Sequence, residues 1–217
     1  MLRLVAFDMD GTLVDVDSSW AAVHRHFDDH NEEGLRRFLA NEIDDEEFIR
    51  SDIAIWKRHA PDLSVYDLEE ILAKVPLVPG AARLLAELHR RAVRTAIVSG
   101  GIDVLARRVA RELSIDLALA NGVRVTAQGR LTGEGIVRVP IHQKEAALAR
   151  VQEMLGIGPA ETASVGNSDI DVGLFRRSRL GIAFRPADDA VRAGAHAIVP
   201  GPDMGDVLPV LERFPAD

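Results

Sequence analysis

Short apolar runs that end in small or polar residues recur along this chain. Runs of this kind are typical of strands that are buried on both faces of a parallel sheet. Patterns of helical period lie between several of them, and the clearest of these follows Gly101. The alternation predicts an α/β fold in which helices cover a parallel sheet. The expected strands are Leu2–Phe7, Val93–Val98, Thr162–Val165, Leu180–Phe184 and Ala197–Val199.

Residues 16–76 carry a different pattern. Apolar residues recur there at helical spacing among charged ones, and no segment has the pattern of a parallel strand. We therefore expect a small helical bundle inserted after the first strand. The chain returns through Pro76–Gly80, a hinge of the kind that separates modules. The predicted division is a core of residues 1–15 and 77–217 and a helical domain of residues 16–76.

A second interruption spans residues 121–139. Val123–Val125 and Ile136–Val139 alternate with period two around a turn at Gln128 and Gly129. This pattern predicts a β-hairpin that projects from the core.

Composition narrows the class of protein. The 217 residues are 47% hydrophobic, and the formal charge of −8 argues against a general nucleic-acid binder. The absence of cysteine excludes disulfides, a thiol nucleophile and thiolate metal sites. The first residues fit neither a signal peptide nor a membrane span, so we expect a cytoplasmic protein with no membrane partner. The sequence predicts no oligomeric state.

Two carboxylates, Asp8 and Asp10, follow the first expected strand and precede a glycine turn. Their i, i+2 spacing lets both point into one site that suits a hard cation and a phosphate. The alternative is an Asx-rich turn that caps a helix. Asp8, with a reference pKa near ~3.9, is the natural nucleophile for an aspartyl-phosphate intermediate. Asp10 would protonate the leaving oxygen and then activate water, with its pKa raised by crowding against Asp8 and the phosphate.

The segment Phe7–Asp15, FDMDGTLVD, resembles the first motif of the haloacid dehalogenase superfamily, most of whose members are magnesium-dependent phosphatases. The resemblance implies a Rossmann-like core and a small helical (C1-type) cap, formed by the insertion, that closes over the site. It also implies the roles given above for the two aspartates. We expect Gly11 and Thr12 to contribute to phosphate binding.

Further along the chain, Ser99, Gly100 and Gly101 follow an expected strand and open a helix. Such a turn can donate backbone N–H groups to a phosphate, although a helix-capping serine is the alternative. VSGG resembles the second motif of the phosphoserine-phosphatase-like branch. Lys144 opens another helix, where a lysine opposes the helix dipole. We expect Lys144 to neutralise Asp8 and the transferring phosphoryl group, the role of the family's third-motif lysine.

The fourth motif, within Ser164–Phe175, departs from the family pattern. Asn167 stands where the family usually has a magnesium-binding aspartate, and Ile170 stands where its branch often has asparagine. Asp171 takes the place of the last aspartate. We expect Mg²⁺ to be held by Asp8, the Asp10 carbonyl, Asn167 and water, with Asp171 acting directly or through water. Because Asn167 brings an oxygen without a charge, weaker magnesium binding is predicted.

The resemblance implies a small phosphorylated metabolite as substrate, with phosphoserine the leading candidate. In phosphoserine phosphatases a cap glutamate and a cap arginine hold the amino acid, and Asp17 occupies roughly the glutamate's place. No arginine of this chain clearly matches the cap arginine, although the stretch Arg50–Arg58 contains candidates. Trp56 either lines the pocket or anchors the cap. A non-catalytic phosphometabolite-binding or regulatory protein and a phosphotransferase remain as alternatives.

A histidine cluster in the insertion is the other candidate for metal chemistry. Only His26 and His30 of His24, His26 and His30 share a helical face, and nothing nearby completes a site. We expect these three side chains to be solvated.

Overall fold

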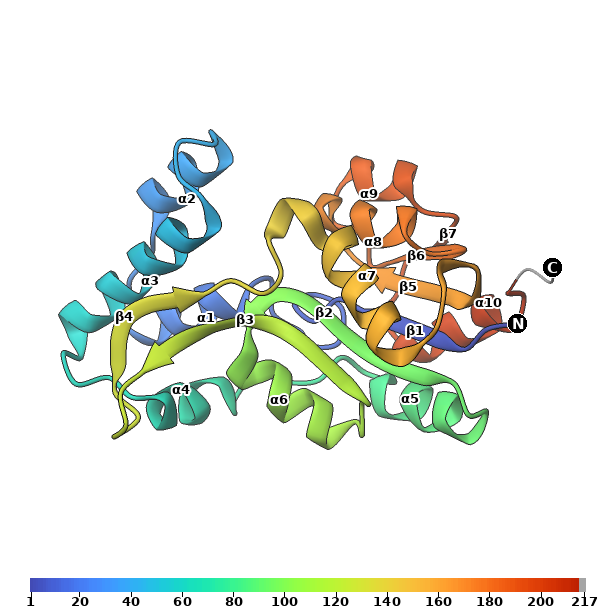
Figure 1. The fold of residues 1–217 in the computed structure, drawn as a ribbon, viewed down its shortest axis with the longest axis horizontal. Helices are drawn as coiled ribbons and strands as arrows, with labels where there is room; N and C mark the ends of the chain where they lie inside the picture. The colour runs from blue at the N-terminus through green and yellow to red at the C-terminus, as the bar shows by residue number, and fades with distance from the viewer. Residues whose placement is uncertain (215–217) are drawn as a thin grey trace.

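A seven-stranded sheet runs through residues 1–214, the part of the chain that this computed structural model describes (Figure 1). Its order is β4-β3-β2-β1-β5-β6-β7, and neighbouring strands are parallel except for the antiparallel pair β3 and β4. The predicted α/β class is confirmed. The strands are β1 (Leu4–Phe7), β2 (Arg94–Ile102), β3 (Leu117–Val125), β4 (Leu131–Ile136), β5 (Thr162–Gly166), β6 (Leu180–Phe184) and β7 (Ala197–Val199).

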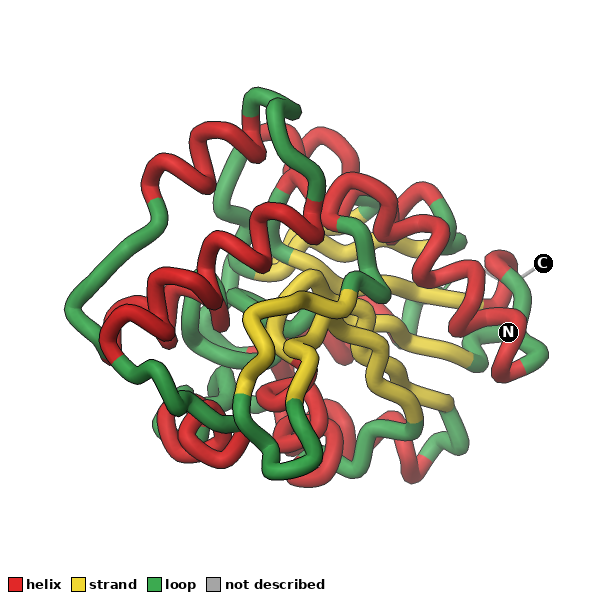
Figure 2. Tube along the Cα trace, turned by 60° about the vertical axis from the view of Figure 1, so that its left-hand side comes forward, coloured by secondary structure: helices red, strands yellow, loops and turns green. Residues whose placement is uncertain are grey.

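Helices cover both faces of this sheet, which lies between them in Figure 2. Alternate residues of β1 pack into two separate apolar clusters: Leu4 and Ala6 join one, and Val5 and Phe7 join the other. Both clusters are buried, so the strand is apolar throughout. The core helices are α5 (Ala81–Arg90), α6 (Asp103–Glu112), α7 (Lys144–Leu155), α8 (Val172–Arg176), α9 (Asp189–Gly194) and α10 (Leu208–Leu211), with 3₁₀ turns η1 (Ile141–Gln143), η2 (Pro159–Glu161), η3 (Asp169–Asp171) and η4 (Met204–Val207).

The insertion after β1 is helical, as its periodicity indicates. Its two connections to the core lie together, since the Asp15 amide donates to the Pro76 carbonyl and the Val78 amide donates to the Leu13 carbonyl, both at 2.9 Å. Capping boxes at Asp44 and Ser64 start two of its helices. The helices of the insertion are α1 (Ser19–His26), α2 (Glu32–Leu39), α3 (Asp45–His59) and α4 (Val65–Leu72).

The hairpin of β3 and β4 projects from the core and packs against this insertion. The Lys57 ammonium donates to the Leu131 carbonyl at 2.7 Å, and the Val65 amide donates to the Gly129 carbonyl at 2.9 Å. A side chain at Gly135 would meet Ile49 of α3 at 2.5 Å, which explains a glycine in the middle of a strand. The hairpin therefore supports the insertion from one side.

The second hairpin strand ends earlier than its alternation predicts. β4 stops at Ile136 instead of running from Ile136 to Val139. The amides of Arg138 and Val139 donate to the Asn121 side-chain oxygen at 2.8 and 2.9 Å, so they leave the ladder with β3. A side-chain acceptor thus overrides the strand pattern at this point.

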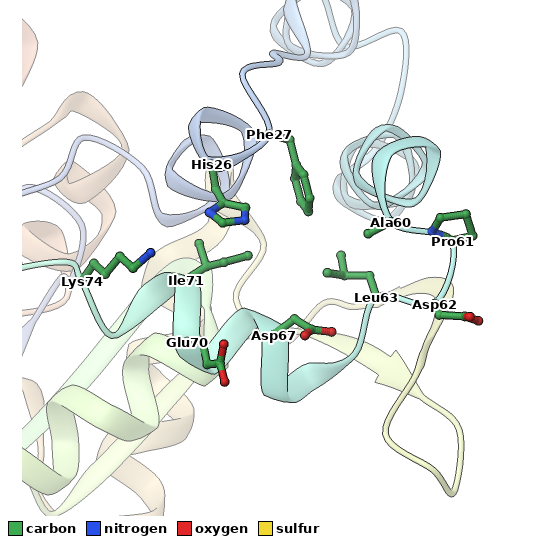
Figure 3. A pocket seen from close by; sticks show the side chains of 10 residues that line it. All are labelled: His26, Phe27, Ala60, Pro61, Asp62, Leu63, Asp67, Glu70, Ile71 and Lys74. Carbon is green, nitrogen blue, oxygen red and sulfur yellow. The ribbon is translucent and has the colours of Figure 1, made fainter.

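A cavity of about 520 Å³ lies within the insertion, between α1, α4 and the segment that precedes α4 (Figure 3). His26, Phe27 and Ile71 are among its lining residues. Two of its carboxylates are already occupied, because Asp62 pairs with Arg130 and Asp67 accepts hydrogen bonds from Ser64. Its lining contains no residue from the strands of the sheet, and it shares no lining residue with the cavity at the end of β1.

Candidate active site

The expected functional residues lie at the switch point of the sheet, where the order of the strands along the chain reverses. The chain passes from β1 to β2 and β3 on one side of β1, and later places β5, β6 and β7 on the other. Open parallel sheets bind ligands at the carboxyl ends of the strands beside such a switch point. A cavity of about 310 Å³ opens there, and its lining includes Asp8, Asp10, Ser99, Lys144 and Asn167.

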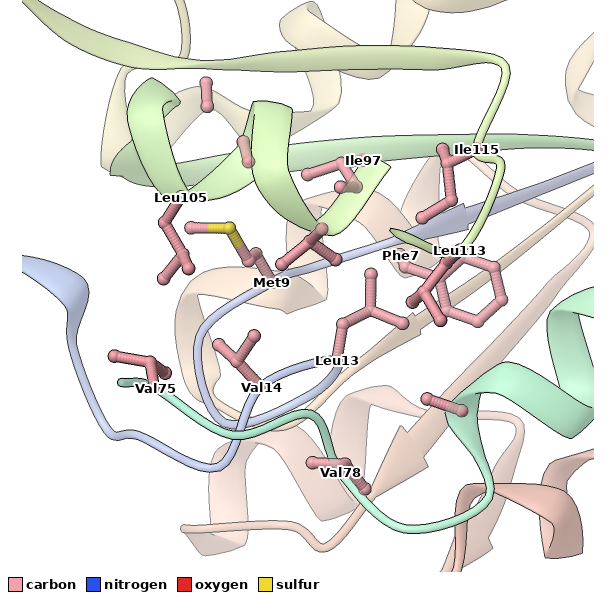
Figure 4. Packing of buried hydrophobic residues seen from close by; sticks show 14 of the residues in the cluster. Phe7, Met9, Leu13, Val14, Val75, Val78, Ile97, Leu105, Leu113 and Ile115 are labelled. Carbon is pink, nitrogen blue, oxygen red and sulfur yellow. The ribbon is translucent and has the colours of Figure 1, made fainter. Parts of the chain in front are cut away.

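The alternation of side chains after β1 directs both aspartates to this cavity. Phe7 and Met9 are fully buried in the apolar cluster, where Leu105 also packs (Figure 4). Asp8 and Asp10 therefore face the opposite way, and both line the cavity. The apolar positions of the motif thus fix the direction of its carboxylates.

Lys144 joins two carboxylates from separate segments. Its Nζ lies 2.8 Å from Oδ1 of Asp8 and 2.7 Å from Oδ1 of Asp171. All three side chains are at most 5% exposed. Burial alone would lower the pKa of Lys144, but Asp171 and Asp8 outweigh it and hold this pKa above its ordinary value. Lys144 is therefore a fixed positive charge on the floor of the cavity.

Asp171 uses both carboxylate oxygens within the chain. Oδ1 accepts from Lys144, and Oδ2 accepts from the backbone amides of Asn167 and Ser168 at 2.9 and 3.1 Å. These contacts orient Lys144 and shape the loop after β5. Asp171 is fully buried and lies outside the cavity lining, so the geometry favours a positioning role over direct metal ligation.

The environment of Asp8 differs from the expectation that it is ionised at its ordinary pKa. Burial raises the pKa of Asp8 to about 7, with Asp171 and Asp10 acting in the same direction and Lys144 opposing them. Only Oδ1 has a hydrogen-bond partner among the described residues. The other oxygen is free to meet phosphorus or a cation.

Asp10 is held by the first turn of α1. Its Oδ2 accepts from both the amide and the hydroxyl of Ser19 at 2.7 Å, and the Ser19 oxygen accepts from the Ile102 amide at 2.9 Å. Oδ1 is buried without a partner in the described chain. The pKa of Asp10 is raised, as expected, but burial is the cause and not crowding by Asp8. Ser19 carries no sequence signal for this role, because the contact depends on how the insertion folds back.

The end of β2 is also held from the insertion, and this strand continues through Ser99, Gly100 and Gly101 to Ile102 instead of ending at Val98 as expected. The Gly100 carbonyl accepts from the Trp20 indole N–H at 3.0 Å and from the Asn121 side chain at 3.3 Å. The Ser99 oxygen accepts from the Gly101 amide at 3.1 Å, which leaves its proton available to a phosphate oxygen. Trp20 and Asn121 were not predicted for this site.

The turn after Asp10 brings Gly11 against Asn167. Gly11 has φ +74°, and a side chain there would collide with the Asn167 amide. Neighbouring Thr12 has a buried hydroxyl without a partner among the described residues. Gly11 therefore lets the fourth-motif loop approach the first motif closely. The amides of Gly11 and Thr12 donate to the Val14 and Met9 carbonyls at 3.1 and 3.2 Å, so the structure gives neither amide a free hydrogen for the phosphate binding expected of these residues.

The available oxygen donors fit a hard cation such as Mg²⁺. The free Asp8 oxygen, the Asp10 carbonyl and the unpartnered Asn167 side chain are all oxygen donors of the kind Mg²⁺ prefers. Only one of them carries a full charge. Within residues 1–214 no group of three or more His, Asp and Glu side chains is arranged to hold a metal. These three oxygen donors fit Mg²⁺, but they bring less negative charge to it than three carboxylates would.

The structure gives the two tryptophans of the insertion different positions. Trp56 is fully buried, lies outside the cavity lining and stacks on Trp20 with ring centroids 5.6 Å apart. Of the two roles expected for Trp56, the geometry supports the buried anchor and not the pocket lining: Trp56 packs beneath Trp20, which lines the cavity. Asp17 also lines the cavity.

His24 corrects a second expectation. It is buried, 5% exposed, and its Nε2 lies 2.8 Å from Oδ1 of Asp52. The His24 ring also meets Trp56 edge-on at 5.5 Å. His24 therefore packs in the interior of the insertion and is not solvated.

Replacing Lys144 by methionine tests the buried ion pairs. Lys144→Met leaves Asp8 and Asp171 without their cation, and we expect a loss of about 3–5 kcal/mol in the free energy of unfolding. Urea denaturation at pH 8 measures it. Lys74→Met, at an exposed position, is the control and should change stability by less than about 0.5 kcal/mol. Equal stability of the two variants would contradict the proposed arrangement.

Membrane crossing finds no support in the described residues, where no helix is both long and apolar enough to span a bilayer.

Comparison with known proteins agrees with the geometry. A family model of haloacid dehalogenase-like hydrolases matches residues 5–176. Phosphoserine phosphatase of Streptomyces coelicolor is 30% identical over 96% of this chain, which spans only 50% of that protein. Phosphoserine phosphatase of Streptococcus thermophilus is 30% identical, with 97% of this chain and 96% of that protein covered. A substrate-bound phosphoserine phosphatase structure superposes with a TM-score of 0.81 at 24% identity, covering 97% and 98% of the two chains. The chain belongs to the haloacid dehalogenase-like hydrolase family.

Proposed function

We propose that this protein is a magnesium-dependent phosphomonoester hydrolase that works through an aspartyl-phosphate on Asp8. The observation that carries the proposal is the Lys144 ammonium, held between Asp8 and Asp171 in the cavity that Asp10 and Ser99 also line. A nucleophile, a fixed positive charge, a carboxyl with a raised pKa and a hydroxyl are the groups that phosphoryl transfer requires.

The first half of the reaction transfers the phosphoryl group to the chain. The free oxygen of Asp8 attacks phosphorus, and the bond between phosphorus and the ester oxygen breaks. Asp10 gives its proton to that oxygen, so the alcohol leaves neutral. Lys144 and the Ser99 hydroxyl stabilise the charge on the phosphoryl oxygens, and Gly100 lines the cavity beside them.

The second half returns the chain to its starting state. Asp10, now a carboxylate, takes a proton from a water that attacks phosphorus. The bond between phosphorus and Asp8 breaks, and inorganic phosphate leaves. Asp10 ends protonated and Asp8 ends as a carboxylate, so both are ready for the next substrate.

Magnesium would be held by Asp8, the Asp10 carbonyl and Asn167. When bound it would neutralise negative charge on the phosphoryl group. Asp171 would hold Lys144 and the loop that carries Asn167.

A small phosphorylated metabolite is the proposed substrate class. Phosphoserine leads it because the relatives that match most of this chain are named phosphoserine phosphatases. We propose that residues 16–76 act as a cap on a core of residues 1–15 and 77–217, since Asp17, Trp20 and Ser18 of this insertion line the cavity. A cytoplasmic location stays a prediction.

The geometry favours a hydrolase over a protein that only binds its ligand and over a phosphotransferase. A protein that only binds a phosphometabolite has no use for a buried carboxyl whose raised pKa suits proton transfer. A phosphotransferase would use the same Asp8 chemistry with an acceptor other than water, and phosphate release separates it from a hydrolase.

Phosphate release tests the function directly. We expect hydrolysis of p-nitrophenyl phosphate and phosphoserine with Mg²⁺, a loss after chelation, and a fall in kcat of at least about 10³-fold in Asp8→Asn. Thermal unfolding of Asp8→Asn shows whether that variant is folded. Turnover that survives in folded Asp8→Asn would overturn the proposal, and so would p-nitrophenol release that needs an added acceptor alcohol and yields no inorganic phosphate.

The magnesium site offers a second prediction. Asn167→Asp adds a charge beside the proposed cation, and we expect magnesium to bind about tenfold more tightly. Titration of activity with Mg²⁺ measures the change. Asp169→Asn, on an exposed side chain two residues away, is the control and should leave the magnesium dependence unaltered. A magnesium affinity that does not increase in Asn167→Asp would argue against Asn167 as a ligand.

A further inference from the structure

The cavity lining contains one carboxylate without a partner among the described residues, that of Asp17, and it indicates the charge of the leaving group. We infer that this site recognises phosphate esters by a positively charged ammonium group and makes no ion pair with a carboxylate. Phosphate esters of amino alcohols would then be hydrolysed at least as efficiently as phosphoserine. This inference rests on the proposed function and adds the substrate class.

Asp17 is the group that would hold the ammonium. It lies just before Ser18, the N-cap of α1, and both residues are part of the cavity lining. No residue within 1–214 forms a hydrogen bond or ion pair with its carboxylate, whereas Asp15, two positions earlier, pairs with Arg185 at 2.8 Å. An unpaired carboxylate beside a phosphate site is suited to a ligand that carries a positive charge.

No cation in the described lining is free to bind a carboxylate. Lys144 is the only Lys or Arg of this lining, and it already contacts Asp8 and Asp171. A carboxylate on the ligand would therefore face Asp17 without compensation, which disfavours its binding.

The arginines and lysine of α3 do not supply the missing charge. Arg50 points to the hairpin, where it lies 2.9 Å from Glu134. Lys57 donates to the Leu131 carbonyl at 2.7 Å, also on the hairpin. Arg58 is exposed and lies outside the cavity lining. The stretch Arg50–Arg58 thus directs its cations away from the substrate.

The rest of the outer lining suits the apolar part of an ammonium ligand. Trp20, Ile141 and Ile170 line the cavity around the polar floor. An indole attracts alkylammonium groups through its ring face, and aliphatic side chains favour a short carbon chain over a second charged group. Trp20 is fixed in place by its stacking on Trp56 and its hydrogen bond to Gly100.

Four esters with the same phosphate and different leaving groups test this inference. O-phosphoethanolamine carries the ammonium, phosphoserine carries ammonium and carboxylate, phosphoglycolate carries only carboxylate, and ethyl phosphate carries neither. We expect kcat/KM for O-phosphoethanolamine to equal or exceed that for phosphoserine, and to exceed that for phosphoglycolate at least about tenfold.

Asp17→Asn identifies the residue responsible. We expect this variant to lower the ratio of kcat/KM for O-phosphoethanolamine to that for ethyl phosphate about tenfold. Asp28→Asn is the matched control, because Asp28 is an exposed carboxylate of the same insertion that lies outside the cavity lining. Its positive φ of 53° also suits asparagine.

The outcomes separate this inference from the proposed function. A preference of about tenfold or more for phosphoserine over O-phosphoethanolamine would overturn the inference, and so would an unchanged ratio in Asp17→Asn. Failure to hydrolyse any of these esters or p-nitrophenyl phosphate would overturn the proposed hydrolase activity, and the inference with it.

Discussion

Three buried charges, those of Asp8, Lys144 and Asp171, hold the centre of this structure together. They come from the end of β1, the start of α7 and the turn η3, and Asp8 and Lys144 alone are 136 residues apart in the sequence. A buried charge without a partner destabilises a protein by several kcal/mol, so each segment requires the others in place. With one cation between two carboxylates, one negative charge is not balanced. That imbalance, together with burial, raises the pKa of Asp8 to about 7, and a bound cation would relieve it.

The insertion is tied to the same centre through two adjacent residues. Ser19 bonds to Asp10 and to the amide of Ile102, while Trp20 bonds to the carbonyl of Gly100. One turn of α1 therefore contacts both the proposed proton donor and the end of β2. Trp56 and the His24–Asp52 pair lie behind Trp20 and fix its position. Movement of the insertion would alter the surroundings of Asp10, which links its position to the chemistry.

The sequence predicts the parts of this site that local rules control. Asp8, Ser99 and Asn167 lie at or just beyond the ends of buried apolar runs, and Lys144 begins a helix, so their convergence follows from the parallel sheet. Ser19, Trp20 and Asn121 could not be predicted, because their roles depend on how distant segments fold together. Trp56 and His24 show the same limit. Helical spacing places both on α-helices but does not say which side chain faces the cavity and which lies beneath it.

The central claim is that Asp8 carries the phosphoryl group between substrate and water. Rapid quenching of Asp10→Asn during turnover of p-nitrophenyl phosphate, followed by mass spectrometry of its peptides, tests this most directly, because that variant lacks the group that activates water and the nitrophenolate leaves without a proton from Asp10. The account predicts an acid-stable, hydroxylamine-sensitive phosphoryl group on Asp8. A phosphoryl group on another residue, or phosphate release by this variant with no labelled peptide at any time, would contradict it.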